Sequence, residues 1–176
     1  KSVERGAEIV VFPELSVTGY TCGDLFFQQS LLQSAEKNLV RIIEASKSTK
    51  SLLFVGIPVG RTEGIYNCAA AILNGKLLAI IAKSYLPNYG EFYERRQFTP
   101  FEQTQNTLFI DFAGFKNVPF GTNILFKDIN QKNLVIGCEL CEDLWVPVPP
   151  SSRHILAGAT LIVNLSCGNE IIGKAD

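Results

Sequence analysis

The segment LVIGCELCEDLWVPVPPSSRHILAGATLIVNLS, residues 134–166, carries the clearest evidence for the fold. Its first run, 134–138, is typical of a buried strand, a capped helix is predicted from about Ser151, and TLIVNLS is typical of a second buried strand. A helix between two buried strands favours the α/β class of folds. The segment also places Cys138 inside the first predicted strand and Cys141 just beyond its end.

The rest of the chain alternates apolar runs with one long amphipathic segment. Residues 24–48 have apolar side chains three and four positions apart, with Asp24 as the predicted cap, which indicates one helix or two in succession. Asn74 and Gly75 between two apolar runs predict a β-hairpin with a type I′ turn. The other predicted strands are residues 8–12, 52–59, 108–112 and 121–126. Residues 84–107 are rich in Pro, Gly and aromatic residues and are predicted to form a long ordered loop.

The composition excludes several classes of protein. The chain has 176 residues, of which 47% are hydrophobic, so it can bury one core as one domain. Sixteen basic and 17 acidic residues leave a net charge of -1, which predicts no nucleic-acid partner and no membrane partner. No apolar run approaches the roughly 20 residues that span a bilayer, and no signal peptide opens the sequence.

The cysteine and methionine content indicates where the protein works and how much of it is present. Five irregularly spaced cysteines suit a reducing compartment, so we predict a cytoplasmic protein. The chain contains no methionine, even at its first position, which indicates a piece of a longer chain.

Three polar residues stand at the ends of predicted strands, and together they form a set suited to acyl transfer. Glu14, Lys83 and Cys141 each follow an apolar run, and strand ends are where an α/β fold brings distant residues together. A thiolate can attack a carbonyl carbon, a carboxylate can move protons and a cation can stabilise the oxyanion. Taken singly, each residue also fits an ordinary role as a cap, a solvated charge or a packed side chain.

The spacing of Cys138 and Cys141 allows a second hypothesis, a redox or metal-binding module. Strand alternation argues against such a pair, because Cys138 lies inside the apolar run and Cys141 lies beyond it. A zinc site needs about four ligands, and the chain has a single histidine, His154. We therefore predict no metal site. A Cys–His dyad would also have to use His154.

Three segments resemble the signature regions of the nitrilase (carbon–nitrogen hydrolase) superfamily. These are VVFPELSVTGY, AKSYLPNYGEFYERRQF and GCELCEDLWVPVPPSSRHILAGATLIVNLS. The resemblance implies a catalytic triad of Glu14, Lys83 and Cys141. It also implies a four-layer αββα sandwich that is incomplete at both ends, so that residues 1–176 are a fragment of one carbon–nitrogen hydrolase domain.

Within the superfamily, LPNYGEFYE and CEDLWVPVPPSSRHILAGA are most similar to the glutaminase domains of glutamine-dependent NAD synthetases. That likeness implies that glutamine is hydrolysed through a thioester and that ammonia passes to a synthetase domain of the same parent chain. ATP and magnesium are implied only for that missing domain, with no cofactor in this one. The family also implies a homo-oligomer. A free-standing amidase or nitrilase is the alternative enzyme.

The resemblance implies substrate-binding roles for six residues outside the triad: Tyr20, Tyr89, Phe92, Glu94, Glu142 and Ser166. Glu94 is the candidate for an auxiliary carboxylate beside the lysine, with Glu91 as its competitor. The backbone N–H of Glu142 is expected to help Lys83 hold the oxyanion. The sequence NLSCGNE departs from the Ser-Pro pair common in relatives, so contacts around Cys167 stay open.

Overall fold

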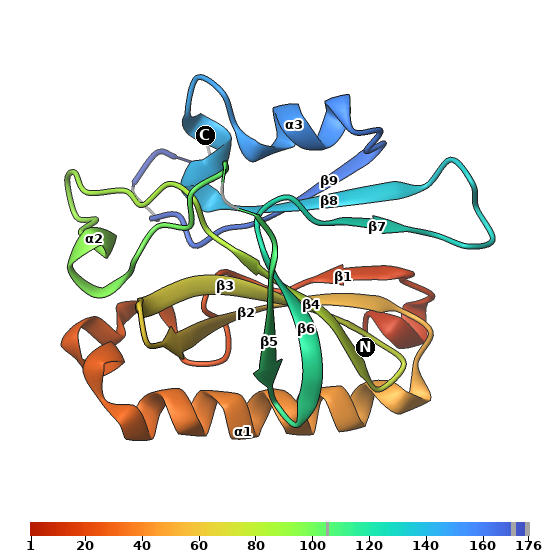
Figure 1. Cartoon of the computed structure of the whole chain (residues 1–176), viewed down its shortest axis with the longest axis horizontal. Coiled ribbons are helices and arrows are strands. Elements are labelled where there is room, and N and C mark those ends of the chain that lie inside the picture. The colour runs from red at the N-terminus through yellow and green to blue at the C-terminus, as the bar shows by residue number, and fades with distance from the viewer. Residues whose placement is uncertain (105, 170–171, 175–176) are drawn as a thin grey trace.

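The fold consists of two β-sheets packed face to face between two helices (Figure 1). It was established from a computed structural model that describes residues 1–104, 106–169 and 172–174. Helix α1, Gln29–Ala45, covers the outer face of one sheet, and α3, Pro150–Leu156, covers the outer face of the other. The predicted αββα order of layers is confirmed. Gln105 of the predicted loop lies outside the described residues.

The larger sheet has six strands in the order β1-β2-β3-β4-β6-β5. These strands are β1 Ile9–Val11, β2 Leu52–Arg61, β3 Gly64–Leu73, β4 Lys76–Ala82, β5 Leu108–Phe112 and β6 Phe115–Gly121. The smaller sheet, in the order β7-β8-β9, contains β7 Leu125–Lys127, β8 Val135–Leu140 and β9 Leu161–Leu165. The short helices are η1 Val3–Arg5, η2 Tyr20–Phe27, η3 Ser46–Ser48, α2 Glu94–Gln97 and η4 Cys141–Trp145.

Two apolar cores separate the layers. Between α1 and the larger sheet, the buried face of the helix, with Leu39 and Ile43, packs against alternate residues of β2 such as Ile57. Between the two sheets, Phe54 from the other face of β2 packs in the same core as Cys138 and Leu140 of β8. β2 is therefore apolar on both faces because each face meets a different layer.

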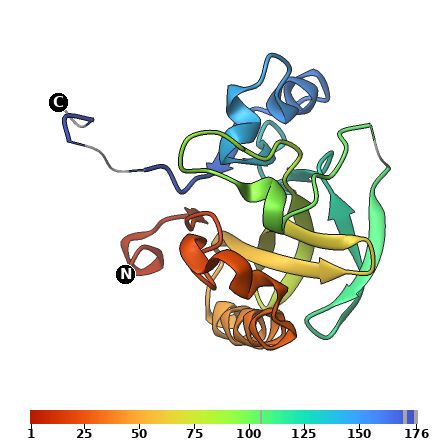
Figure 2. The ribbon, with the colours of Figure 1, turned by 90° about the vertical axis from the view of Figure 1, so that its left-hand side faces the viewer.

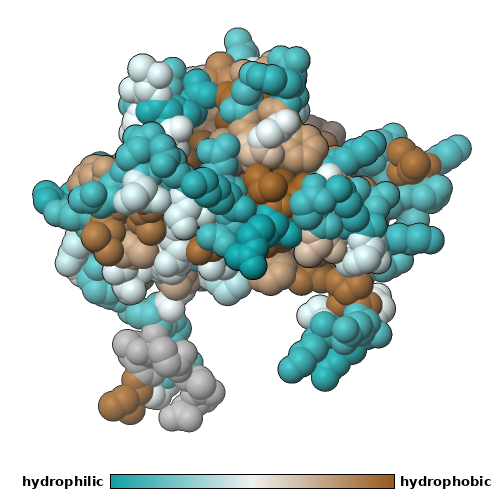
Figure 3. All heavy atoms as spheres, turned by 90° about the horizontal axis from the view of Figure 1, so that it is seen from below, coloured by the Kyte–Doolittle hydropathy of each residue, from teal (hydrophilic) through white to brown (hydrophobic). Residues whose placement is uncertain are grey.

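The outer surface on the α1 side is mostly hydrophilic, with scattered apolar side chains (Figure 3). This agrees with the pattern of α1, where buried Ala35, Leu39 and Ile43 recur every four residues and exposed polar residues lie between them. Of the helices that the structure describes, none is both long and apolar enough to cross a membrane. In the view of Figure 2, residues 166–169, which follow β9, run outward from the two sheets.

Several boundaries differ from the sequence predictions. The predicted strand 121–126 is two strands in different sheets, because the chain crosses from β6 to β7 at residues 122–124. Thr122 is held at this crossing by its Oγ1, which donates to the Ala82 carbonyl at 2.9 Å. Apolar content alone cannot reveal such a change of partner. β8 also continues to Leu140, two residues beyond its predicted end.

The start of the long helix was predicted wrongly. α1 begins at Gln29 without a side-chain cap, and Asp24 lies in η2. The Asp24 carboxylate instead accepts two hydrogen bonds of 2.7 Å from the Arg96 guanidinium. The predicted hairpin is confirmed, since Asn74 and Gly75 have φ values of 48° and 74°, as a type I′ turn requires.

Two glycines allow close contacts that place functional segments. At Gly137 of β8, a Cβ atom would lie 2.7 Å from Nδ1 of His154, so the absence of a side chain lets α3 pack closely on the smaller sheet. At Gly56 of β2, a Cβ atom would lie 2.3 Å from the backbone nitrogen of Leu15 and 2.4 Å from the carbonyl oxygen of Pro13. The backbone that carries Glu14 therefore rests directly on β2.

A Gly56→Ala variant is expected to lose about 1–3 kcal/mol of unfolding free energy, because the added methyl group meets backbone atoms that cannot rotate away. The matched control is Gly121→Ala, whose nearest new contact would be 3.4 Å from a Phe101 ring carbon. Thermal unfolding of both variants provides the comparison. Equal losses in the two variants would contradict close packing at Gly56.

Candidate active site

A buried cluster of charges lies at the ends of the strands of the larger sheet. We call Glu14, Lys83 and Glu94 the carboxylate–lysine cluster. Nζ of Lys83 donates to Oε1 of Glu14 at 2.5 Å and to Oε1 and Oε2 of Glu94 at 2.8 and 3.0 Å. The side chains of Lys83 and Glu14 are 0% exposed, and that of Glu94 is 4% exposed. One ammonium group is thus shared by two carboxylates away from water.

Each member of the cluster comes from a different part of the chain. Glu14 follows β1, Lys83 follows β4 and Glu94 begins the one-turn helix α2. β1 pairs with β2 in parallel, and β3 pairs antiparallel with both β2 and β4. This pairing brings Glu14 and Lys83 together. Asn67 on β3 completes the arrangement, because its Nδ2 donates to Glu14 Oε1 at 2.8 Å and to Glu94 Oε2 at 3.3 Å, and its carbonyl accepts the Lys83 N–H.

The surroundings of the cluster alter its proton affinities. Burial raises the pKa of Glu14, as does the charge of Glu94, and these effects outweigh the lowering by Lys83. Burial alone would lower the pKa of Lys83, but the charges of Glu14 and Glu94 raise it above its ordinary value. Lys83 is therefore a permanent cation. Glu14 is a stronger base than an exposed glutamate, and its Oε2 is buried without a hydrogen-bond partner among the described residues.

Cys141 lies on a strained turn where β8 passes into η4. Its φ of 43° is in the left-handed region, which a residue with a side chain rarely adopts. The turn is held by Asn164 of β9, whose Oδ1 accepts the Cys141 N–H at 3.1 Å and whose Nδ2 donates to the Cys141 carbonyl at 3.4 Å. Glu139 supports this contact, since its Oε1 accepts from Asn164 Nδ2 at 3.5 Å and its Oε2 accepts the Ser151 N–H at 3.0 Å.

Ser166 connects the cysteine to the carboxylate–lysine cluster. Its Oγ donates to Sγ of Cys141 at 3.2 Å, and its carbonyl accepts the backbone N–H of Glu14 at 3.4 Å. Burial and the charge of Glu14 raise the pKa of the Cys141 thiol, whereas Ser166 and the charge of Lys83 lower it, with a net increase. The raised pKa keeps the thiol mainly protonated near neutral pH. Ser166 thus links the Cys141 thiol to the backbone of Glu14, and the predicted grouping of Glu14, Lys83 and Cys141 stays a prediction.

Cys138 has different surroundings from Cys141. It is fully buried in the core between the sheets, and burial raises the pKa of its thiol well above the ordinary value. All five cysteines are free thiols. Across residues 1–104, 106–169 and 172–174, no group of three or more His, Cys, Asp or Glu side chains is arranged to hold a metal ion.

The aromatic residues singled out in the sequence line up beside the cluster. The hydroxyl of Tyr20 donates to Glu94 Oε1 at 2.7 Å, and its ring meets that of Phe92 edge-on at 6.3 Å between centroids. Phe92 in turn meets Tyr89 at 6.0 Å, and the Tyr89 hydroxyl donates to Glu142 Oε2 at 2.8 Å. Tyr89 is 60% exposed, so this end of the aromatic row is open to solvent.

Of the two candidates for the carboxylate beside Lys83, Glu94 and Glu91, only Glu94 contacts the lysine. Glu94 is buried against Lys83, whereas Glu91 is exposed and accepts a hydrogen bond from the side chain of Asn169. Sequence reasoning missed Asn67, Asn164 and a buried carboxylate, Asp143. Asn67 had a visible signal, because it is a polar residue in the middle of an apolar strand run.

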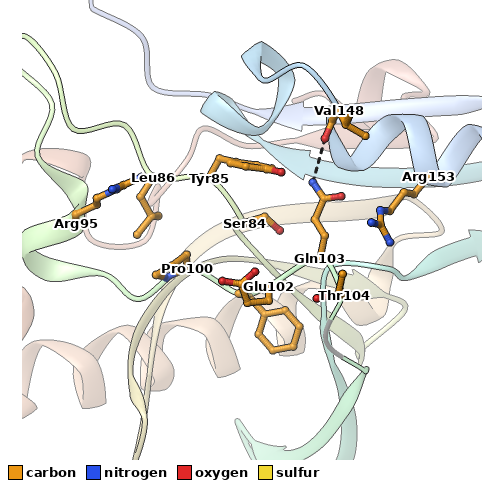
Figure 4. Close-up of a pocket in the computed structure, with 11 residues that line it drawn as sticks. Ser84, Tyr85, Leu86, Arg95, Pro100, Glu102, Gln103, Thr104, Val148 and Arg153 are labelled. Carbon is orange, nitrogen blue, oxygen red and sulfur yellow. Dashed lines mark hydrogen bonds between the residues drawn. The ribbon is translucent and has the colours of Figure 1, made fainter.

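A pocket of about 450 Å³ lies beside this site but contains none of the three strand-end side chains (Figure 4). Its wall includes Ser84 and Tyr85, which follow Lys83, and Arg153 of α3. Gln103 crosses the pocket and donates to the carbonyl of Val148 at 3.3 Å. The pocket is therefore a hollow separate from the carboxylate–lysine cluster.

The fold and the site together define a hydrolase. The chain belongs to the carbon-nitrogen hydrolase family, whose model matches residues 1–173. Among curated relatives, it is 42% identical over 173 residues to the glutamine-dependent NAD(+) synthetase of Mycobacterium tuberculosis, which covers 98% of this chain and 25% of the relative. It is 32% identical over 187 residues to the human glutamine-dependent NAD(+) synthetase, and this match covers 100% of this chain and 26% of the human protein.

Solved structures agree with this assignment. A glutamine-dependent NAD(+) synthetase from Cytophaga hutchinsonii superposes with a TM-score of 0.82 at 31% identity, over 99% of this chain and 27% of that one. A Nesterenkonia amidase of the nitrilase superfamily shares the fold, with a TM-score of 0.63 at 20% identity over 95% of this chain and 55% of that one. The chain spans about a quarter of the length of the curated relatives it matches.

Proposed function

We propose that this chain is the glutaminase domain of a glutamine-dependent NAD synthetase, in which Glu14, Lys83 and Cys141 form the catalytic triad. The observation that carries the proposal is the buried ion cluster around Lys83 next to a cysteine on a strained turn. The choice of glutamine rests on the 42% identity to synthetases named for their dependence on it.

In the proposed mechanism, the unpartnered Oε2 of Glu14 accepts the thiol proton while Sγ of Cys141 attacks the carboxamide carbon of glutamine. The carbonyl oxygen becomes an oxyanion, which Lys83 and the backbone N–H of Glu142 stabilise. Glu14 returns the proton to the leaving nitrogen, so ammonia departs and a thioester remains. Water, deprotonated by Glu14, then adds to the thioester, and its collapse releases glutamate and regenerates the thiol.

The six residues outside the triad receive roles that their positions support. Glu94 balances the charge of Lys83, because a second carboxylate keeps the ammonium ionised in a buried site. The row of Tyr20, Phe92 and Tyr89 forms one wall of the substrate site, and Glu142 anchors its outer end. Ser166 holds the thiol in place through its hydroxyl group.

The proposal extends to the parent protein. Residues 1–176 are a fragment of one carbon–nitrogen hydrolase domain, and a synthetase domain of the same parent chain binds ATP and magnesium and receives the ammonia. Five free thiols are compatible with the reducing cytoplasm. A homo-oligomer is supported by exposed apolar side chains after the nucleophile: Leu144, Trp145, Val148, Ile155 and Leu156. Light scattering of the full-length protein tests this last point, and a monomer would contradict it.

The full-length protein is expected to release glutamate and ammonia from glutamine and to react at Cys141 alone with a glutamine analogue that carries an electrophile. The control is Cys138→Ala, because Cys138 is buried in the core and cannot reach the reagent. Peptide mapping after labelling measures the site of attachment. Label found mainly at Cys138, or wild-type protein that does not hydrolyse glutamine, would overturn the proposed function.

A further inference from the structure

Asp143 is a buried carboxylate for which the proposed mechanism has no use. It lies in η4, two residues after Cys141, and is 0% exposed. Burial raises its pKa to about 7, although three backbone hydrogen bonds and the charge of Lys83 act in the opposite direction. A carboxylate kept in such a place costs folding free energy, so its contacts need an explanation.

The two oxygens of Asp143 reach both halves of the site. Oδ1 accepts the backbone N–H of Ser84 at 3.1 Å and that of Tyr85 at 2.8 Å. Oδ2 accepts the backbone N–H of Leu140 at 3.1 Å. Ser84 directly follows Lys83, and Leu140 directly precedes Cys141. A single side chain therefore joins the end of β4 in the larger sheet to the end of β8 in the smaller one.

The apolar core between the two sheets cannot fix this alignment by itself. Lys83 and Cys141 stand on different sheets, which pack through apolar side chains that carry little directional information. Hydrogen bonds from a carboxylate to backbone N–H groups are short and directional. On the β4 side, Ser84 is also fixed through its Oγ, which lies 3.0 Å from Oγ1 of Thr122. The three hydrogen bonds of Asp143, which we call the clamp, therefore join two segments that other hydrogen bonds, at Ser84 and at Cys141, also hold in place.

We propose that Asp143 is a positioning residue that holds the Lys83 ammonium group in line with the Cys141 thiol across the two sheets. The inference rests on the proposed function, because alignment matters only if these two groups act on one substrate. Asp143 itself touches no reacting atom. Its loss is expected to misplace the oxyanion and its cation, and a displacement of about 1 Å can cost on the order of 100-fold in rate.

The test compares Asp143→Asn with wild type in the full-length protein. Asparagine keeps the size of the side chain but presents an NH₂ group to a backbone donor, so one side of the clamp opens. We expect kcat for glutamine hydrolysis, counted per Cys141 that a glutamine-like electrophile titrates, to fall about 10- to 100-fold with KM changed less than threefold. A residue important only for folding would reduce the number of titratable sites and leave the rate per site unchanged.

Asp128→Asn is the matched control, because the Asp128 carboxylate also accepts two backbone N–H groups, from Asn130 and Gln131 at 2.6 and 2.8 Å, but in an exposed turn. Its kcat is expected to equal that of wild type. If Asp143→Asn yields no folded protein, Asp143→Glu decides, since it keeps the charge and lengthens the clamp by one methylene group. A wild-type rate per site in the variant that folds overturns the proposal for Asp143, whereas inactive wild-type protein overturns the proposed function instead.

Discussion

A Lys83→Met variant of the full-length protein is expected to lose about 100- to 1,000-fold in kcat for glutamine hydrolysis, because the oxyanion loses its cation in a site that excludes water. The same change is expected to lower the unfolding free energy by about 3–5 kcal/mol. Methionine fills the space of the lysine stem but leaves Glu14 and Glu94 buried side by side without a cation between them. Steady-state kinetics and thermal unfolding measure the two effects.

Lys116→Met is the matched control for Lys83. Lys116 also pairs with a carboxylate, that of Asp111 at 2.6 Å, but the two side chains are 79% and 57% exposed. Such a pair contributes at most about 1 kcal/mol to stability, and its loss is expected to leave turnover unchanged. A double variant, Lys83→Met with Glu94→Gln, is expected to recover stability without activity. Near-normal turnover in Lys83→Met would show that the oxyanion does not need this cation.

A Glu14→Gln variant is expected to lose about 100- to 10,000-fold in kcat, the range typical of removing a general base. The thiol should nevertheless stay reactive. Because the charge of Glu14 raises the pKa of Cys141, its neutralisation lowers that pKa and increases the fraction of thiolate at a given pH. Alkylation of Cys141 by iodoacetamide is therefore expected to be as fast as in wild type or faster.

Glu63→Gln provides the control for Glu14, since Glu63 is an exposed carboxylate beside Arg61. The pH profile gives a second measurement. Glu14 must be ionised to accept the proton, and burial raises its pKa above 4.5, so the acid limb of kcat/KM in wild type should lie above pH 4.5. Alkylation that slows as much as turnover in Glu14→Gln would indicate a collapsed site and would argue against a base.

The α/β class of the fold could be predicted from local chemistry, whereas the four-layer order was implied by the resemblance to the nitrilase superfamily. The apolar side chains of α1 recur at helical spacing, so one face of this helix must pack against a sheet. The apolar residues on both faces of β2 require a packed layer on each side of that strand. The turn at Asn74 and Gly75 could be predicted from two residues. The crossing at residues 122–124 could not, because an apolar strand residue looks the same in either sheet. Asp24 was misread as a cap because its partner, Arg96, is 72 residues away.

By itself, the sequence determined that Glu14, Lys83 and Cys141 follow apolar runs, and the resemblance to the nitrilase superfamily implied that the three form a set. The sequence could do so because the end of a strand is marked by the residues that directly follow the apolar run in the sequence. Only the tertiary structure decided that Glu94 and not Glu91 pairs with Lys83, and that Asp143 joins the two sheets. These choices depend on distances between segments far apart in the chain, and hydrogen bonds and charges act over a few ångströms of space, whatever the number of residues between them.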